Sequence, residues 1–189
     1  MEAEEYIAIL NADGSPTGKT CLKSEIHHKG YYHNTAHVWF YNDHAEILLA
    51  QRAANKVIYP LLWDISVAGH VDAGETIAQA AIRETREEIG LEITEQDLLK
   101  VGVYDCFQSY PNGIVDNEFH HTYIAKINKT INDLKLDPEE VQQAKFVSIP
   151  EFLELLNNSA NNSHFVQSNT NYYLEVIKAI ENQITNTDA

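Results

Sequence analysis

The sequence predicts one domain in which strands and helices intermix, of the α/β or α+β class. Three observations support this class. Strand-like segments recur along the chain, amphipathic helical segments lie among them, and apolar residues make up 44% of the 189 residues, which is enough for a hydrophobic core. We divide the chain into N-terminal strands at 1–30 that pack on a central domain at 31–157, followed by a mobile segment and a C-terminal helix at 158–189.

The first half of the chain is predicted to consist mostly of strands. Its strand-like segments are separated by clusters of turn residues such as Asn, Asp and Gly. The predicted strands are residues 6–10, 20–23, 33–42, 45–52 and 64–68. Residues 24–29 are expected to form one helical turn that stops at Gly30, and residues 53–63, which include Pro60, are expected to form a loop.

A longer helix is predicted to begin near Thr76 and to end at Gly90, where helices commonly adopt the left-handed conformation. Four residues at helical spacing form the stripe predicted to face the core: Ala78, Ile82, Thr85 and Ile89. Three glutamates share roughly one third of the helix circumference on another side. They are Glu84, Glu87 and Glu88.

The second half of the chain adds further strands and helices. Thr94 is expected to cap a short helix over residues 94–99. The predicted strands are residues 100–108, 117–126 and 144–148, and Pro150 suits the first turn of a helix that follows. Residues 157–171 are rich in Asn and Ser and are predicted to be a mobile surface segment, whereas residues 172–184 have the apolar spacing of a terminal helix.

Charge and cysteine content restrict the classes of partner. The net charge of −15 argues against binding nucleic acid, so a phosphate ligand would need a local positive patch or a metal ion. The cysteines Cys21 and Cys106 form no disulfide framework and suit a reducing compartment. The N-terminal residues show no secretory signal, and no apolar run approaches the roughly 18 residues of a membrane span. We therefore expect a cytoplasmic protein with no membrane partner.

The three clustered glutamates predict a metal site. Carboxylates on one arc of a helix repel each other, and hard divalent ions such as Mg²⁺ bind carboxylate oxygens while keeping positions open for water and phosphate. The alternative is a solvated helix face, which is the common explanation for an isolated glutamate pair. That alternative leaves Gly69, the turn at Gly74 and Glu75, and Arg83 unexplained.

Residues 69–91 resemble the Nudix box. The box runs Gly, five residues, Glu, seven residues, Arg-Glu, a bulky apolar residue, any residue, Glu-Glu, any residue, Gly and a bulky apolar residue. The positions that match in register are Gly69, Glu75, Arg83, Glu84, Glu87, Glu88, Gly90 and Leu91. Thr85 departs from the pattern, which prefers Ile, Leu or Val, and this difference concerns packing rather than chemistry.

This resemblance implies a Nudix-type α/β/α sandwich with a mixed β-sheet, and a metal-dependent hydrolase for a small diphosphate substrate. In the family, one to three Mg²⁺ or Mn²⁺ ions bind the box against a diphosphate. The groups carried over as metal ligands or catalytic groups are Glu84, Glu87, Glu88 and the backbone carbonyl of Gly69. Arg83 would pair with Glu75 or a box glutamate and hold the geometry. The general base differs within the family and stays unassigned. A homodimer is compatible with the resemblance.

A second resemblance, over roughly residues 5–150, is to the branch near isopentenyl-diphosphate isomerases and the hydrolases beside them. It implies a second metal site formed by His27 (or His28), His33, His70, Asp116 and Glu118. It also implies diphosphate contacts from Lys23, Arg52 and Lys56. The alternatives are that these histidines are ordinary hydrogen-bonded or surface residues, and that the basic residues are ordinary loop charges.

The sequence also departs from the isomerases. They need a cysteine just before the box loop as one arm of a proton shuttle, whereas Val67 and Ala68 stand at that place here. They also tend to lose the acid that Glu84 represents, and this chain keeps it. Both differences favour hydrolysis over isomerisation. Three hypotheses follow: a hydrolase of a nucleoside diphosphate-linked or other organic diphosphate, an isopentenyl-diphosphate isomerase-like enzyme, and a non-catalytic nucleotide-binding Nudix module.

Overall fold

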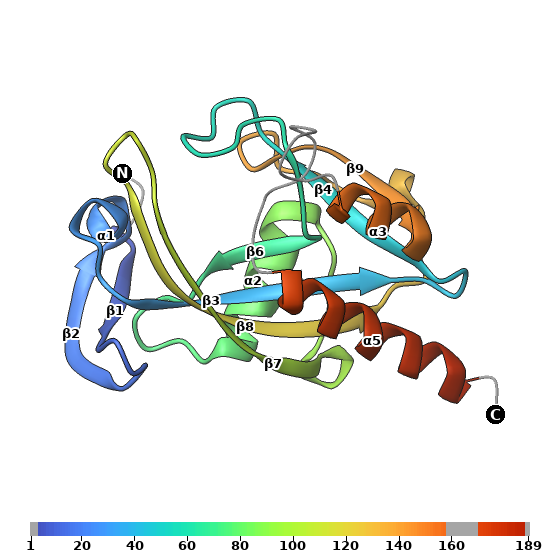
Figure 1. Ribbon diagram of the computed structural model, residues 1–189, viewed down its shortest axis with the longest axis horizontal. Coiled ribbons are helices and arrows are strands. Elements are labelled where there is room, and N and C mark those ends of the chain that lie inside the picture. Colours follow the sequence, from blue (N-terminus) through green and yellow to red (C-terminus); the bar gives the residue numbers. More distant parts are fainter. Residues whose placement is uncertain (1–3, 158–169, 188–189) are drawn as a thin grey trace.

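The computed structural model describes residues 4–157 and 170–187 (Figure 1). Its strands are β1 (Tyr6–Leu10), β2 (Pro16–Leu22), β3 (His33–Tyr41), β4 (Glu46–Arg52), β5 (Trp63–Asp64), β6 (Val67–His70), β7 (Leu99–Ser109), β8 (Val115–Lys126) and β9 (Val141–Ser148). Its helices are α1 (Lys23–Lys29), α2 (Ile77–Ile89), α3 (Ile149–Asn157) and α5 (Thr170–Thr187). Short 3₁₀ turns lie at Glu95–Asp97 and Ile131–Asp133.

A mixed seven-stranded sheet forms the centre of the molecule. β3 runs parallel to β8, starting at the pair His33 and Glu118, and β8 pairs antiparallel with β7. On its other edge, β3 pairs with β6 over residues 35–38 but with β4 only at Tyr41. β4 pairs instead with β9 and β5. β4 therefore separates from β3 soon after the turn that joins them, and this separation opens space between the strands.

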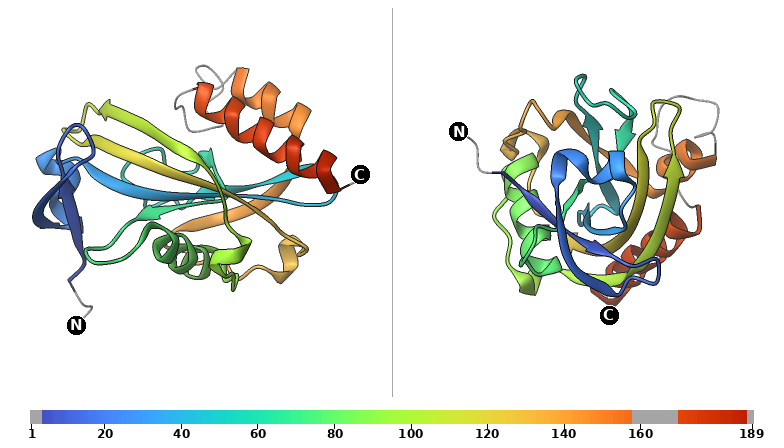
Figure 2. Two further views of the ribbon diagram at one scale, coloured as in Figure 1. Left: turned by 90° about the horizontal axis from the view of Figure 1, so that it is seen from below. Right: turned by 90° about the vertical axis from the view of Figure 1, so that its left-hand side faces the viewer.

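Helices cover both faces of the sheet (Figure 2). One core, which includes Val38 and Ile89, lies between the sheet and α2. The other core, which includes Trp39, Phe152 and Ile177, lies between the sheet and helices α3 and α5. Val38 and Trp39 can serve opposite cores because successive side chains of a strand point to opposite faces. The predicted α/β/α sandwich with a mixed sheet is confirmed.

The N-terminal residues form a β1–β2 hairpin followed by α1, and they pack at the end of the main sheet (Figure 1). Their small core consists of Ile7, Cys21 and Ile26. The helix α1 stops at Gly30 as the sequence predicted, and Gly30 has a left-handed φ of 60°. A backbone hydrogen bond from Leu10 to Tyr32, 2.7 Å long, ties the hairpin to the start of the main sheet. This packing brings His27 next to the ends of β3 and β8.

The single strand predicted over residues 64–68 is wrong in its extent. The chain changes partner within it, because β5 pairs with β4 whereas β6 pairs with β3. Ser66 lies between the two short strands and is fully buried. Its hydroxyl accepts a hydrogen bond from the amide of Phe40 and donates one to the carbonyl of Leu48, so it joins the neighbouring strands where the ladder is interrupted.

Helix α2 begins and ends where the sequence predicted. Thr76 and Gln79 form a capping box at its start, and Gly90 has a left-handed φ of 69° at its end. The predicted core stripe is only partly correct, because Ala78 and Ile82 are half-buried. The residues that α2 buries are Ala80, Ala81, Glu84, Thr85, Glu88 and Ile89. The buried arc is wider than an apolar stripe because the carboxylate side of the helix also faces protein.

Other boundaries differ by a few residues. The strand predicted over 20–23 is the end of β2, since Lys23 already begins α1. The short helix predicted over 94–99 is a single 3₁₀ turn, with the predicted cap between Thr94 and Asp97. The proposed division at 30 and 157 stays a prediction, and most of the segment predicted to be mobile lies outside the described residues. None of the helices in the described part of the chain combines the length and apolar character needed to cross a bilayer.

Candidate active site

A cavity of about 290 Å³ lies where β4 separates from β3, and residues from both halves of the chain line it. One wall comes from α2 and from the end of β6, and the floor comes from alternate residues of β3, β7 and β8. The start of α5 closes one side with Tyr172 and Tyr173. Ten of its lining residues are candidate metal-binding, catalytic or phosphate-binding residues of the sequence analysis, so most of the predicted site lies in this one cavity.

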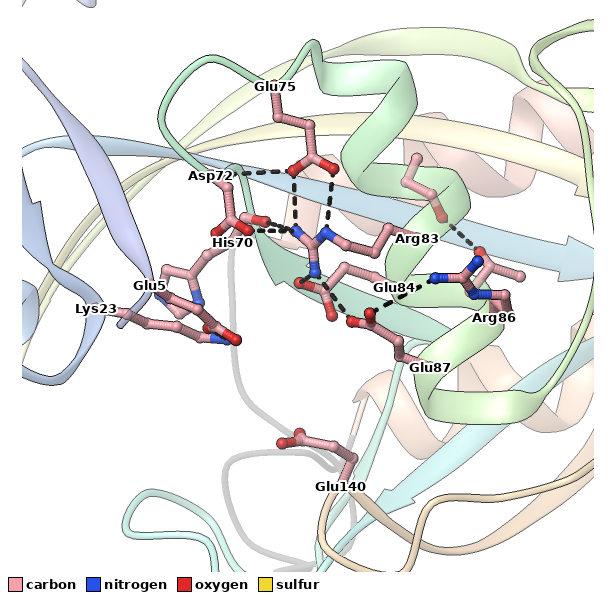
Figure 3. Close-up of polar contacts among 12 residues, drawn as sticks. Glu5, Lys23, His70, Asp72, Glu75, Arg83, Glu84, Arg86, Glu87 and Glu140 are labelled. Atoms are coloured by element: carbon pink, nitrogen blue, oxygen red, sulfur yellow. Dashed lines mark hydrogen bonds and ion pairs between the residues drawn. The ribbon is translucent and has the colours of Figure 1, made fainter. Parts of the chain in front are cut away.

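Arg83 organises the loop that precedes α2 (Figure 3). Its guanidinium binds both carboxylate oxygens of Glu75, at 3.0 and 2.9 Å, and donates to the backbone carbonyl of His70 at 2.9 Å. It also donates to Glu84 at 2.8 Å and to Glu87 at 3.1 Å. Although burial opposes its charge, the contacts with Glu75 and Glu84 raise the pKa of Arg83. Arg83 is therefore a permanent cation that fixes the loop against the helix.

Gly69 gives Glu84 the room it occupies. A Cβ atom at position 69 would lie 2.0 Å from the carboxylate carbon of Glu84, far inside van der Waals contact. Glycine is therefore required here for close approach of the backbone to the glutamate side chain. Gly69 and Glu84 both line the cavity, and the predicted role of the Gly69 carbonyl as a metal ligand stays a prediction.

The three box glutamates have different environments. Glu84 and Glu88 are each 7% exposed and line the cavity, whereas Glu87 is exposed and faces Arg83 and Arg86. Burial raises the pKa of Glu84, although Arg83 acts in the opposite direction. Burial, followed by the charges of Glu84 and Glu140, raises the pKa of Glu88 well above its ordinary value.

These two buried carboxylates fit a divalent cation. Across the described ranges, 4–157 and 170–187, no ion pair neutralises Glu88. A buried charge without a counterion is unfavourable, and carboxylate oxygens beside an open cavity are the donors that Mg²⁺ and Mn²⁺ prefer. Glu84, Glu88 and Gly69 line the cavity, whereas the ligand roles predicted for them and for Glu87 stay predictions.

Glu140 is a cavity residue that sequence reasoning missed. It lies just before β9, in a segment that docks on the end of α2 through backbone hydrogen bonds from Lys135 to Ile89 and from Asp137 to Glu88. Glu140 lines the same cavity as Glu84 and Glu88, and its carboxylate pairs with Lys56. Its sequence neighbourhood is that of an ordinary acidic surface turn, so no local signal distinguished it.

The predicted histidine cluster does assemble. His27, His33, His70 and Glu118 each place one ligand atom within 4.8 Å of the others. The Nε2 atoms of His27 and His70 are 2.9 Å apart, and Nε2 of His33 lies 3.5 Å from Glu118. Burial lowers the pKa of His70 to about 3, so this imidazole is neutral and able to bind a metal. His28, the alternative to His27, is exposed.

Asp116 lies beside the histidine cluster and contacts His27. Its carboxylate lies 2.9 Å from Nδ1 of His27, on the far side of that ring from the cluster, and it accepts a hydrogen bond from the hydroxyl of Tyr110 at 2.8 Å. The group of atoms that lie within 4.8 Å of one another does not include Asp116, and its predicted role as a ligand stays a prediction. The strand period correctly placed Asp116 and Glu118 on one face, but it could not show that His27 lies between Asp116 and the cluster.

The three predicted phosphate-binding residues all line the same cavity, although each already has an acidic partner. Lys23 pairs with Glu5 at 2.6 Å, and Arg52 pairs with Asp64 at 3.2 Å. Lys56 pairs with Glu140, as described above. These cations come from α1, β4 and the loop after β4, so only the tertiary fold gathers them. Six acidic residues line the same cavity, so the predicted local positive patch is not found there.

The cavity also contains a thiol, but not at the expected isomerase position. Ala68 lines the cavity just before the box loop, and Cys106 of β7 lines it from the floor. Burial, followed by the charge of Glu118, raises the pKa of Cys106 to about 12. The thiol is therefore protonated at neutral pH.

Comparisons with known proteins identify the family of this chain. The chain matches the NUDIX domain family over residues 31–168. It is 34% identical over 159 residues to Nudix hydrolase 3 of Arabidopsis thaliana, covering 82% of this chain but 20% of that protein. It is 32% identical over 160 residues to the isopentenyl-diphosphate Delta-isomerase of Enterobacter sp. (strain 638), covering 82% of this chain and 83% of that protein. The chain thus spans about a fifth of the plant relative and most of the isomerase.

Solved structures share the fold. The crystal structure of DR0079 from Deinococcus radiodurans superposes with a TM-score of 0.66 at 18% identity, covering 94% of this chain and 98% of that one. The MutT protein from Methanosarcina mazei superposes with a TM-score of 0.59 at 16% identity, covering 80% and 94%. The sequence match, the box geometry and the shared fold lead to one conclusion: this chain belongs to the Nudix family.

Proposed function

We propose that this protein is a divalent-metal-dependent hydrolase that cleaves the diphosphate linkage of a nucleoside diphosphate-linked or other small organic diphosphate. The observation that carries the proposal is the pairing of Glu84 with Glu88 in the cavity wall. These buried carboxylates share one cavity with Lys23, Arg52 and Lys56. A cation-binding wall and a group of basic side chains in one cavity suit a diphosphate, which needs its charge neutralised on more than one side.

The residues of this chain would act as follows. Glu84 and Glu88 would hold Mg²⁺ or Mn²⁺, which neutralises phosphate charge and lowers the pKa of bound water. Arg83 and Gly69 would keep Glu84 in place. The basic residues would orient the phosphates by exchanging their present acidic partners for substrate oxygens, a change favoured by the two negative charges of the substrate.

The test is the substitution Glu88→Gln, which keeps the shape of the side chain and removes its charge. We expect hydrolysis of an active compound from a diphosphate panel to fall roughly 100-fold or more, because the metal loses an anionic ligand. When both proteins are free of metal, Glu88→Gln should melt no lower than the wild type. The reason is that the amide carries no buried charge for Glu84 and Glu140 to repel.

Glu92→Gln is the matched control, since Glu92 is an exposed acid just beyond the box. It should leave turnover unchanged. Turnover by Glu88→Gln equal to that of the wild type would contradict the proposed metal role. Tight nucleotide binding by the wild type, with no hydrolysis of any compound in the panel, would instead support a non-catalytic binding module.

We also propose that the cluster of His27, His33, His70 and Glu118 binds a divalent ion. The 2.9 Å separation of the His27 and His70 nitrogens supports this proposal, because two imidazole nitrogens that bind one ion face each other at such distances. Nε2 of His33 is buried without a hydrogen bond among the residues that the structure describes, so this nitrogen is also available to bind the ion.

The same cluster, and the nearly full-length match to an isomerase, favour one alternative function. An isopentenyl-diphosphate isomerase-like activity would need a proton shuttle in which Ala68 cannot take part. Cys106 is the thiol available in the cavity. Incubation with isopentenyl diphosphate and Mg²⁺ or Zn²⁺ tests this alternative, and absence of allylic product removes it. Product that persists in Cys106→Ala would exclude the thiol as the shuttle.

A further inference from the structure

The polar floor of the cavity continues beyond the histidine cluster. On β3, the residues His33, Thr35 and His37 share one face, and on β8 the residues Glu118 and His120 lie beside them. His37 and His120 are 8% and 6% exposed, and their ring centroids are 4.0 Å apart. Neither residue belongs to the Nudix box or to the predicted cluster.

His37, His120 and Glu118 form a compact donor set of their own. Each offers one ligand atom, and these atoms lie within 4.8 Å of one another. Glu118 belongs to both sets and divides its oxygens between them. Oε1 lies 3.5 Å from Nε2 of His33, whereas Oε2 lies 2.8 Å from Nε2 of His120. Its carboxylate therefore faces both groups of histidines at once.

We infer that His37, His120 and Glu118 bind a second transition-metal ion, for which Zn²⁺ is suited, and that Glu118 bridges this ion to the one held by His27, His33 and His70. Two imidazoles with one carboxylate are a donor set that binds Zn²⁺ and leaves further positions open. Those positions would face the cavity, because all three residues line it.

The surroundings of His37 support this assignment. Nδ1 of His37 lies 2.9 Å from the hydroxyl of Tyr172, and the indole N–H of Trp39 donates to the same oxygen at 2.7 Å. A metal-binding histidine commonly donates its other ring N–H to a fixed acceptor, which sets the tautomer and the ring orientation. With Nδ1 engaged by Tyr172, Nε2 of His37 is the atom left for a ligand.

An unpartnered hydroxyl lies between the two donor sets. Thr35 is 4% exposed and lines the cavity, and its Oγ1 atom has no hydrogen-bond partner among the described residues. A buried hydroxyl left without a partner is costly, so a bound ligand or metal-bound water at this place would satisfy it. Thr35 thus independently indicates a polar ligand between the two sets of histidines.

One shared ion cannot serve both sets. His33 and His37 are four residues apart on one strand, and a strand rises about 3.3 Å per residue, so their backbones are separated by roughly 13 Å. Both imidazoles cannot reach a single ion at the roughly 2.0–2.1 Å of a Zn–N bond. An ordinary hydrogen-bonded network would explain the contact between His120 and Glu118, but it leaves Oγ1 of Thr35 without a partner among the described residues.

The test is metal stoichiometry, measured on the full chain after chelation and titration with Zn²⁺ by calorimetry and elemental analysis. His37→Asn and His120→Asn should each bind one Zn²⁺ fewer than the wild type, and His33→Asn should lose a different single equivalent. Any ion bound at Glu84 and Glu88 is present in the wild type and in all these variants, so it does not contribute to the difference in bound Zn²⁺ between them. The experiment does not depend on hydrolysis, so failure of the proposed function would not affect it.

His121→Asn is the matched control. His121 is the next residue of β8, on the opposite face, where its Nε2 contacts the side chain of Asn34 at 2.9 Å. His121→Asn should bind the same number of Zn²⁺ ions as the wild type. A full count in folded His120→Asn, checked by circular dichroism, would overturn the second site. Replacement of both ions by Co²⁺ tests the bridge, since magnetic coupling is expected for two ions that share Glu118, and two filled but uncoupled sites would overturn it.

Discussion

Gly69 and Glu84 show how one missing side chain shapes the site. Gly69 follows the first residues of β6, and Glu84 projects from α2 into the space that a Cβ at position 69 would fill. The need for glycine at position 69 depends on Glu84, because an added methyl would clash only while the Glu84 side chain occupies that space. The residue pair therefore allows a stability test that separates close packing from backbone flexibility.

We predict that Gly69→Ala destabilises the protein by about 1–3 kcal/mol, because the added methyl overlaps the carboxylate of Glu84. Denaturant unfolding measures this loss. In a Glu84→Ala background the methyl would have room, so Gly69→Ala should then cost much less. Equal losses in both backgrounds would show that the conformation of Gly69, rather than its contact with Glu84, sets its identity.

At the scale of the element, α2 works as a unit with the loop before it. Arg83 is the only residue of the helix shown to reach Glu75, the carbonyl of His70 and two glutamates together within the described structure (Figure 3). Its planar guanidinium can make these contacts in several directions, which a lysine ammonium cannot reproduce. Arg83 therefore determines how the loop at residues 70–75 lies against the metal-binding wall.

We predict that Arg83→Lys lowers hydrolysis about 10- to 100-fold, because the charge remains but the positioning of Glu84 is lost. Arg86→Lys is the matched control, since Arg86 is exposed and its contact with Glu87 is 3.9 Å long. It should leave the rate within about twofold of the wild type. Steady-state kinetics on both variants measure the difference, and equal rates would contradict a special role for the guanidinium.

At the scale of the whole molecule, the C-terminal helix completes the cavity. Tyr172 of α5 is 1% exposed, and its hydroxyl contacts His37 and Trp39 of β3, far away in the sequence. The helix thus serves as more than a cover for the hydrophobic core. It supplies a hydrogen-bonding group at the floor of the cavity.

We predict that Tyr172→Phe lowers the free energy of unfolding by about 1–3 kcal/mol, because the buried N–H of Trp39 loses its acceptor. Tyr6→Phe is the control, because Tyr6 is exposed and its hydroxyl contacts only the neighbouring Glu4 among the described residues. It should unfold at the wild-type denaturant concentration. A small effect of Tyr172→Phe would show that water satisfies Trp39 in place of the hydroxyl.

Local patterns determined much of this protein. The fixed spacing of the box identified Gly69, Arg83 and the clustered glutamates, and the helix ends at Thr76 and Gly90 followed from capping chemistry that depends only on neighbouring residues. Alternation along strands identified most of the sheet, and a family resemblance predicted the histidine cluster. These features are carried by short segments, so they are visible before folding.

The tertiary structure alone decided which of these groups meet. Only packing shows that Glu88 is buried whereas Glu87 is exposed, that Asp116 contacts His27, and that Glu140 lines the same cavity as Glu88. It also brings Tyr172 onto His37. Such contacts join residues far apart in the chain. A linear pattern does not encode how deeply a side chain is buried or which residue of another element it contacts. Spacing specifies which side chains share a face, whereas packing specifies what that face meets.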